Sequence, residues 1–148
     1  METSRGKTLS QFTTNGSVLL SLLTMLVFLD IFFTIAHISF TLFNLVGWIW
    51  KRTRKAHLIT LGLTLLSWFV FGIWYGWGYC FLTDWHWQVK EKLGEKNLPN
   101  SFIKYFADKL TGKDINPSLV DNVTLGCLIF AIVAAVYVNF TRRKGKAV

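Results

Sequence analysis

The chain has 148 residues; 52% are hydrophobic and 16% aromatic, and the formal net charge is +8. A soluble domain of this length would need more charge to cover its surface, so the composition favours a membrane protein. Eight of the 16 Lys and Arg residues gather in two short clusters beside apolar blocks, and the others form no basic stripe on a soluble module. This arrangement argues against nucleic acid as a partner.

Three apolar blocks cover residues of about 17–48, 56–81 and 117–140. Each exceeds the roughly 20 residues that cross a bilayer core as a helix. We therefore expect an all-α integral membrane helical bundle with three transmembrane helices, forming a single membrane domain over residues 1–148. The first block is far too long for the apolar part of a cleaved signal peptide, so we expect it to remain in the protein.

The first block carries polar residues at a helical spacing. Asp30, His37 and Asn44 are seven residues apart, with Thr34 and Thr41 between them. Seven residues of α-helix fall about 20° short of two turns, so these side chains form one stripe. A charged group facing mid-bilayer is costly, and we predict that the stripe faces protein or water. Two roles stay open: bonds between helices, or a path for protons or a small solute.

The second block ends in a dense group of Trp, Tyr and Phe residues, which is typical of a helix end in the head-group layer. Gly72 and Gly76 are four residues apart in this region. This small-xxx-small spacing predicts a face that packs closely against another helix.

The connection of about residues 83–116 should be helical and lie outside the membrane. Thr83 or Asp84 could cap a first short helix that ends at Gly94. A second helix would follow Ser101, with apolar residues at helical spacing, and end at Gly112. This second segment is amphipathic and too short to span, so we expect it on the membrane surface or folded over the bundle. Asn116 and Pro117 predict the start of the third span.

A second polar group follows the second block: Cys80, Thr83, Asp84 and His86. Such a group could form a metal site or an activated thiol at the outer surface. Its spacing matches no strong metal signature, and the alternative is a helix cap with a histidine at the interface. We expect no disulfide between Cys80 and Cys127, because Cys127 should lie about two turns deeper.

No cofactor is expected from the histidines. His37, His57 and His86 fall at different depths of their helices, so no two can form a bis-histidine haem pair. We expect His57 to lie at the interface beside a basic cluster, and no metal site is predicted.

Two basic clusters flank the blocks and should contact anionic lipid head groups on the cytoplasmic side. Their residues are Lys51, Arg52, Arg54, Lys55, Arg142, Arg143 and Lys144. With three spans, this arrangement predicts the N-terminus outside and the C-terminus in the cytoplasm.

Several short motifs resemble a known family. His37 precedes Phe40, Phe43 and Gly47, and the segment Gly78-Tyr79-Cys80-Phe81-Leu82-Thr83 follows the second block. Together with Arg54, His57 and Leu58, these residues are similar to the small bacterial membrane-protein family known as domain of unknown function 2784, in the variant of Bacteroidota-type bacteria. Phe81 stands where that family usually has Pro, and His86 stands near a position where many members have Glu. The resemblance implies a bacterial inner-membrane location and no established activity.

We therefore expect a small multi-pass inner-membrane protein whose stripe serves helix assembly or a partner, either another copy or a larger membrane complex. The alternative is a proton-coupled transport or redox component that uses Asp30 and His37. The sequence contains no phosphate-binding loop, nucleophile elbow or protease metal motif, so an enzyme is not supported.

Overall fold

The computed structural model describes the backbone of residues 3–144 and the side chains of residues 16–139. The described part of the chain is helical, without strands. Three helices are long and apolar enough to cross a membrane, over Gly16–Val46, Arg54–Tyr75 and Pro117–Asn139. The predicted all-α architecture with three membrane helices is confirmed.

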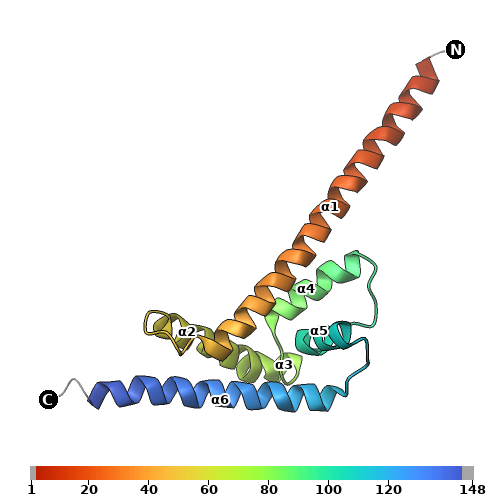
Figure 1. Ribbon diagram of the computed structural model, residues 1–148. Helices are drawn as coiled ribbons and strands as arrows, with labels where there is room; N and C mark the ends of the chain where they lie inside the picture. Colours follow the sequence, from red (N-terminus) through yellow and green to blue (C-terminus); the bar gives the residue numbers. More distant parts are fainter. Residues whose placement is uncertain (1–2, 145–148) are drawn as a thin grey trace.

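The first helix, α1 (Thr3–Val46), is a single rod of 44 residues. It contains no proline, and long apolar side chains fill most of its length, so nothing in the sequence interrupts it. Figure 1 shows that only its C-terminal part lies among the other helices, while its N-terminal part projects away from them. Among the described side chains of this projecting part, those of residues 16–29, most are apolar and most are exposed.

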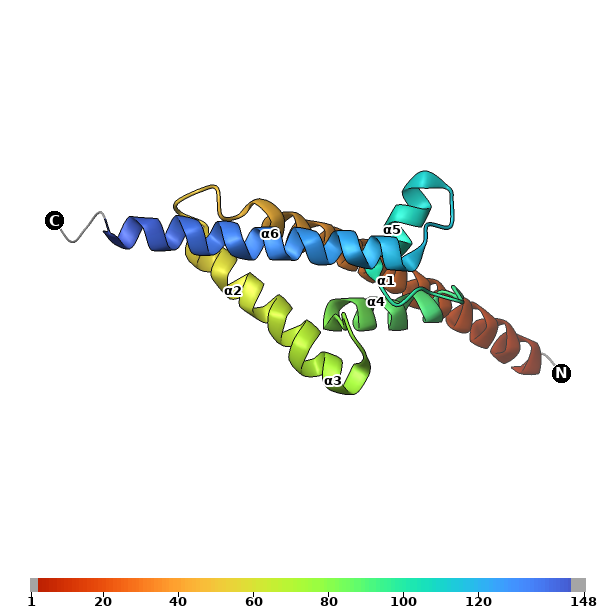
Figure 2. The same cartoon turned by 90° about the horizontal axis from the view of Figure 1, so that it is seen from below.

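The second membrane helix consists of three segments: α2 (Arg54–Leu65), the π-helical turn η1 (Leu66–Phe71) and α3 (Gly72–Tyr75). It ends at Gly76, whose φ of +103° an L side chain rarely adopts. The helix is therefore shorter than the predicted range of about 56–81. In Figure 2, this bent rod begins beside the C-terminal part of α6 and diverges from it toward α3.

The connection holds two short helices, α4 (Phe81–Lys92) and α5 (Phe102–Thr111). Cys80, rather than Thr83 or Asp84, occupies the N-cap position of α4, so Thr83 lies within the first turn. Gly112 ends α5 in the left-handed conformation, with a φ of +65°. Figure 1 shows α4 along α1 and α5 above the start of α6, so the amphipathic segment folds over the bundle.

The last helix is α6 (Pro117–Lys144). The side chain of Asn116 accepts a hydrogen bond from the backbone N–H of Ser118 at 2.9 Å, which caps the helix as its sequence predicts. The main apolar core lies where α2 meets α6 and contains Leu61, Leu128, Ala131 and Ala135. Ala131 and Ala135 are four residues apart, and their small side chains let the two helices approach closely.

Candidate functional site

The polar stripe on α1 points toward the other helices. His37 and Asn44 are buried, with 6% and 9% of their surfaces exposed, and Asp30, Thr34 and Thr41 are half-buried. The stripe has three levels along α1. Asp30 meets α4, His37 meets the start of α4 and α5, and Asn44 meets α2.

At the first level, two side chains of α4 converge on one carboxylate oxygen. Asp30 Oδ1 lies 2.6 Å from His86 Nε2 and 2.9 Å from Lys90 Nζ. His86 is fully buried and Lys90 is 2% exposed. A buried cation is costly unless it is paired, so Asp30 is what allows these two side chains to lie against α1.

Lys90 continues the network toward the surface. Its ammonium group lies 3.0 Å from Glu95 Oε1 and 4.7 Å from the centre of the Tyr105 ring. The Tyr105 hydroxyl donates to Glu95 Oε2 at 2.9 Å. These contacts bind α1, α4, α5 and the loop that holds Glu95 into one layer.

The protonation of this layer follows from its contacts. Burial opposes the charged form of Lys90, but its contacts with Tyr105, Asp30 and Glu95 outweigh burial and raise the Lys90 pKa. Burial lowers the pKa of His86 and outweighs the opposing effect of Asp30. The layer therefore holds a charged lysine between two carboxylates, with a neutral histidine donating to Asp30.

At the second level, His37 is held by three neighbours. Its ring stacks on Phe102 of α5, with centroids 4.2 Å apart and planes 17° apart. Its Nε2 lies 3.4 Å from the Thr83 hydroxyl and 3.7 Å from the Cys80 sulfur. The other ring nitrogen, Nδ1, is buried and has no hydrogen-bond partner within the described chain.

At the third level, Asn44 joins α1 to α2. Its amide nitrogen donates to the Thr64 hydroxyl at 2.8 Å, and its backbone oxygen lies 2.8 Å from His57 Nε2. The Asn44 side-chain oxygen is buried without a partner in the described chain. His57 is fully buried within the chain, one turn after the start of α2, and its predicted depth at the membrane interface stays a prediction. It packs against Gly47, where a Cβ atom would come within 2.8 Å of the imidazole.

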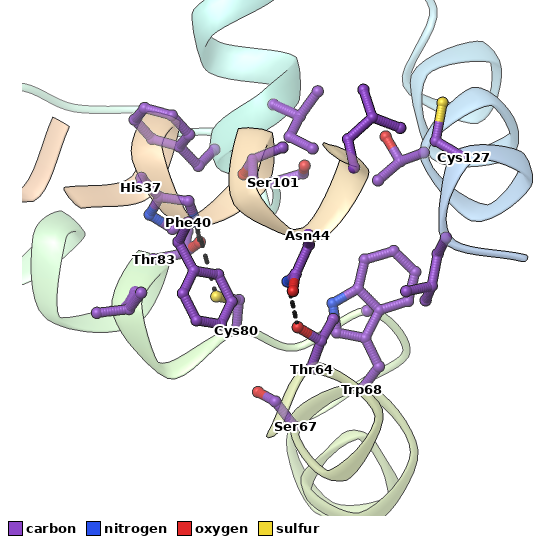
Figure 3. A pocket seen from close by; sticks show the side chains of 18 of the residues that line it. His37, Phe40, Asn44, Thr64, Ser67, Trp68, Cys80, Thr83, Ser101 and Cys127 are labelled. Carbon is purple, nitrogen blue, oxygen red and sulfur yellow. Dashed lines mark hydrogen bonds between the residues drawn. The ribbon is translucent and has the colours of Figure 1, made fainter. Parts of the chain in front are cut away.

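A cavity of about 280 Å³ connects the second and third levels. Its walls come from α1, α2, η1, the start of α4, the start of α5 and α6. Figure 3 shows His37, Cys80 and Thr83 gathered at one side, and the Asn44 side chain reaching from α1 to Thr64. The cavity also includes Ser67 and Trp68 of the π-helical turn, a local distortion that occurs frequently at functional sites.

The structure divides the predicted outer group between two levels. His86 contacts Asp30, while Cys80 and Thr83 contact His37. Asp84 is exposed on another face of α4 and accepts from Gln88 at 3.1 Å. Cys80 and Thr83 thus lie at an earlier turn of α4 than His86, and the predicted outer site stays a prediction. Among the described residues, no group of three or more metal-binding side chains lies together.

Both cysteines are free thiols and both line the cavity. Cys80 contributes from the loop before α4, and Cys127 from α6. Cys127 is exposed, which places it at the rim.

The predicted helix-packing role of Gly76 is wrong. Gly76 lies after the end of α3, is exposed, and has open space around its Cα. A Cβ atom on Gly72 would make ordinary contact with the following turn, at Trp77 and Gly78. Close helix packing occurs instead through Ala131 and Ala135 of α6.

The basic residues near the second helix differ in their surroundings. Lys51, Arg52 and Lys55 are exposed. Arg54 is half-buried and donates to the backbone oxygens of Trp48 at 3.1 Å and Val138 at 3.4 Å. This contact places the 51–55 cluster beside the C-terminal part of α6. The side chains of Arg142, Arg143 and Lys144 lie outside the described residues.

Sequence reasoning missed Lys90, Glu95, Tyr105 and Phe102. A signal was present for Lys90, because Thr83, His86 and Lys90 recur at the spacing of one helical face. That face meets the stripe, so the two polar series are complementary. No sequence pattern predicted the roles of Glu95 and Tyr105. Their approach to Lys90 depends on the path of the loop between α4 and α5.

Comparison with known proteins identifies one family. No curated protein matches the chain, and no solved structure matches it. The model of the family described as "Protein of Unknown function (DUF2784)" matches residues 27–140, which include the stripe, both short helices and most of α6. The predicted resemblance is confirmed, and the chain belongs to the DUF2784 family.

Proposed function

We propose that this protein is a non-enzymatic subunit of the bacterial inner membrane, in which the polar stripe fixes α1 against α4 and α2 so that α1 can meet a partner. The observation that carries this proposal is that Asp30, His37 and Asn44 each bond to another element of the same chain. Such bonds between membrane helices fix register and orientation.

The spacing of the ionisable groups favours assembly over proton conduction. Asp30, His86, Lys90 and Glu95 are close together at one end of the bundle. His37 lies seven residues further along α1, about 10 Å at the rise of an α-helix. Between these two levels, the stripe offers only the hydroxyl of Thr34, which donates to the backbone oxygen of Asp30.

A partner would bind residues 16–29 of α1, the exposed half of its apolar part. The apolar part of α1 covers Gly16–Val46, which is 31 residues. That length corresponds to about 46 Å of helix, against a bilayer core of about 30 Å. Within the chain, the most apolar window of this segment has no buried residue. A helix from another copy or from a larger complex would cover the part that the lipid core does not.

The positions of the two basic clusters support one orientation of the chain in the membrane. Arg54 contacts the backbone near the end of α6, so the 51–55 cluster and the C-terminal end lie on the same side of the bundle. We propose that this side is cytoplasmic and contacts anionic head groups, with the N-terminus outside.

The second candidate is a proton-coupled transport or redox component. Two contacts favour it: Glu95 links the Asp30 layer to the surface, and His37 lies 3.7 Å from a free thiol. The variants Asp30→Asn and His37→Gln separate the candidates, because they keep hydrogen bonding but remove titration. Loss of a growth or transport phenotype at normal protein levels would support the second candidate. A fall in protein level would support assembly.

The partner is tested by native electrophoresis of the tagged protein after mild detergent extraction. We expect a complex larger than the 17.0 kDa chain. Met25→Ala combined with Phe28→Ala, on the exposed half of α1, should shift it toward the monomer. The matched control, Ile129→Ala with Val133→Ala, changes exposed apolar residues of α6. A wild-type protein that migrates as a monomer contradicts the proposal.

A further inference from the structure

The cavity beside the stripe has the chemistry of a ligand site. None of the described residues that line it is Asp, Glu, Lys or Arg, and most are apolar. A charged molecule would lose its hydration there without gaining a partner. The site therefore suits a neutral molecule with a large apolar part. Its volume of about 280 Å³ lies just below the usual range for ligand pockets, which is roughly 300–1,000 Å³.

Two buried polar atoms of lining residues lack partners: the side-chain oxygen of Asn44 and Nδ1 of His37. Both side chains are more than nine-tenths buried. Buried polar atoms are nearly always hydrogen-bonded, and each exception requires a reason. A ligand in the cavity would supply the missing partner.

The orientation of Asn44 determines what kind of group that partner is. The Thr64 hydroxyl donates its hydrogen to the backbone oxygen of Thr60 at 2.9 Å, so it accepts from Asn44. The amide nitrogen of Asn44 is thereby committed to Thr64, and the amide oxygen is left to accept. The ligand must therefore donate a hydrogen bond at this position. His37 can complement either a donor or an acceptor, depending on its tautomer.

We propose that this cavity binds a neutral amphipathic alcohol, with its hydroxyl group donating to Asn44 and its apolar part against Trp68, Leu63 and Leu128. The hydroxyl satisfies the Asn44 oxygen, and the apolar part fills a space lined by aromatic and aliphatic side chains. The alcohol could come from the bilayer, as a lipid with a free hydroxyl group, or from solution as a small molecule. Both present the same chemistry to the cavity.

The test uses the full-length protein in nanodiscs and two photoreactive probes, a diazirine analogue of decanol and the matching analogue of decane. Mass spectrometry of the labelled peptides gives the positions. We expect the decanol probe to label the residues around the cavity and excess decanol to compete with it. Loss of one hydrogen bond in Asn44→Leu should weaken its apparent affinity about fivefold. The decane probe should label the cavity less strongly than the decanol probe.

A second variant, Cys127→Phe, tests the proposal independently in case Asn44→Leu does not fold. Cys127→Phe places a ring at the exposed rim and should remove the competed labelling, while Ile129→Phe, an exposed position of α6 that does not line the cavity, should keep it. Circular dichroism confirms the helix content of each variant. Labelling that is spread over all exposed faces and not competed by decanol would overturn the proposal. So would equal labelling in Cys127→Phe and Ile129→Phe, or no labelling at all, as a cavity holding only water would give.

Organic extraction of the purified protein then distinguishes the sources. A hydroxyl lipid recovered at about one molecule per chain identifies the bilayer as the source. Competed labelling without a co-purified lipid identifies a soluble alcohol.

Discussion

Residues 16–29 and 30–46 of α1 are both rich in large apolar side chains but have different surroundings. In residues 16–29, nearly every large apolar side chain is exposed. In residues 30–46, five polar side chains form one line, and that line meets α4, α5 and α2. Hydrocarbon side chains gain nothing by leaving lipid for protein, whereas polar side chains do. The polar stripe, rather than apolar surface, therefore determines which half of this apolar part packs within the chain.

The largest effect is expected from Phe102→Ala. Phe102 is 4% exposed and stacks on His37, so its removal leaves a void beside the packed half of α1. The free energy of unfolding should fall by about 3–5 kcal/mol. The matched control is Phe28→Ala in residues 16–29, which should change the free energy of unfolding of the monomer by less than about 0.5 kcal/mol. Both are measured by unfolding in mixed detergent micelles, and equal losses would contradict the comparison.

Asp30→Asn should have the next largest effect. The change removes the carboxylate that neutralises Lys90, while Glu95 remains as its second partner. We expect a loss of about 2–3 kcal/mol in the free energy of unfolding. Asp84→Asn, at an exposed position of α4, is the control and should be nearly neutral. If the two variants unfold alike, the Asp30 layer does not hold α1 to α4.

A smaller effect is expected where α1 ends. Gly47→Ala places a methyl group 2.6 Å from the backbone oxygen of Phe43 and 2.8 Å from a ring carbon of His57, so the backbone turn and the buried imidazole must both shift. We expect a loss of about 1–3 kcal/mol by the same unfolding assay. Gly62→Ala is the matched control, since a methyl group there meets nothing within 4 Å and alanine favours helix. Stabilisation of both variants would show that the turn after α1 is not tightly packed.

The smallest expected effect is on the pH dependence of the free energy of unfolding. Burial opposes ionisation of Glu95, but its contacts with Lys90 and Tyr105 outweigh burial and lower the Glu95 pKa below its ordinary value of 4.5. Its contribution to stability is therefore complete above pH 4.5 and is lost as the pH falls through the lowered value. Because Glu95 is partly exposed, we expect less than about 1 kcal/mol. Unfolding curves at several acidic pH values should show a weaker pH dependence in Glu95→Gln than in Glu91→Gln.

The three membrane helices follow from the length of the apolar blocks, and the alignment of the stripe follows from its periodicity. Asp30, His37 and Asn44 are seven residues apart, and two helical turns bring such positions into line whatever else the chain does. Their partners could be predicted only in part. His86 and Lys90 share a face of α4, but Phe102, Glu95 and Tyr105 reach the stripe through a loop whose path no local pattern determines. The packing role predicted for Gly76 failed for a related reason. A glycine at that spacing fits the end of a helix as well as a face that packs against another helix.

Oxygen accessibility of spin labels along α1 tests most directly whether the stripe separates the two halves. Each position from 17 to 46 would carry a single label, in a protein with Cys80 and Cys127 replaced by serine and one chain per nanodisc. From 17 to 29 we expect high accessibility on every side of the helix. From 30 to 46 we expect a helical period with minima at Asp30, Thr34, His37, Thr41 and Asn44. The same accessibility pattern in both halves would contradict the account.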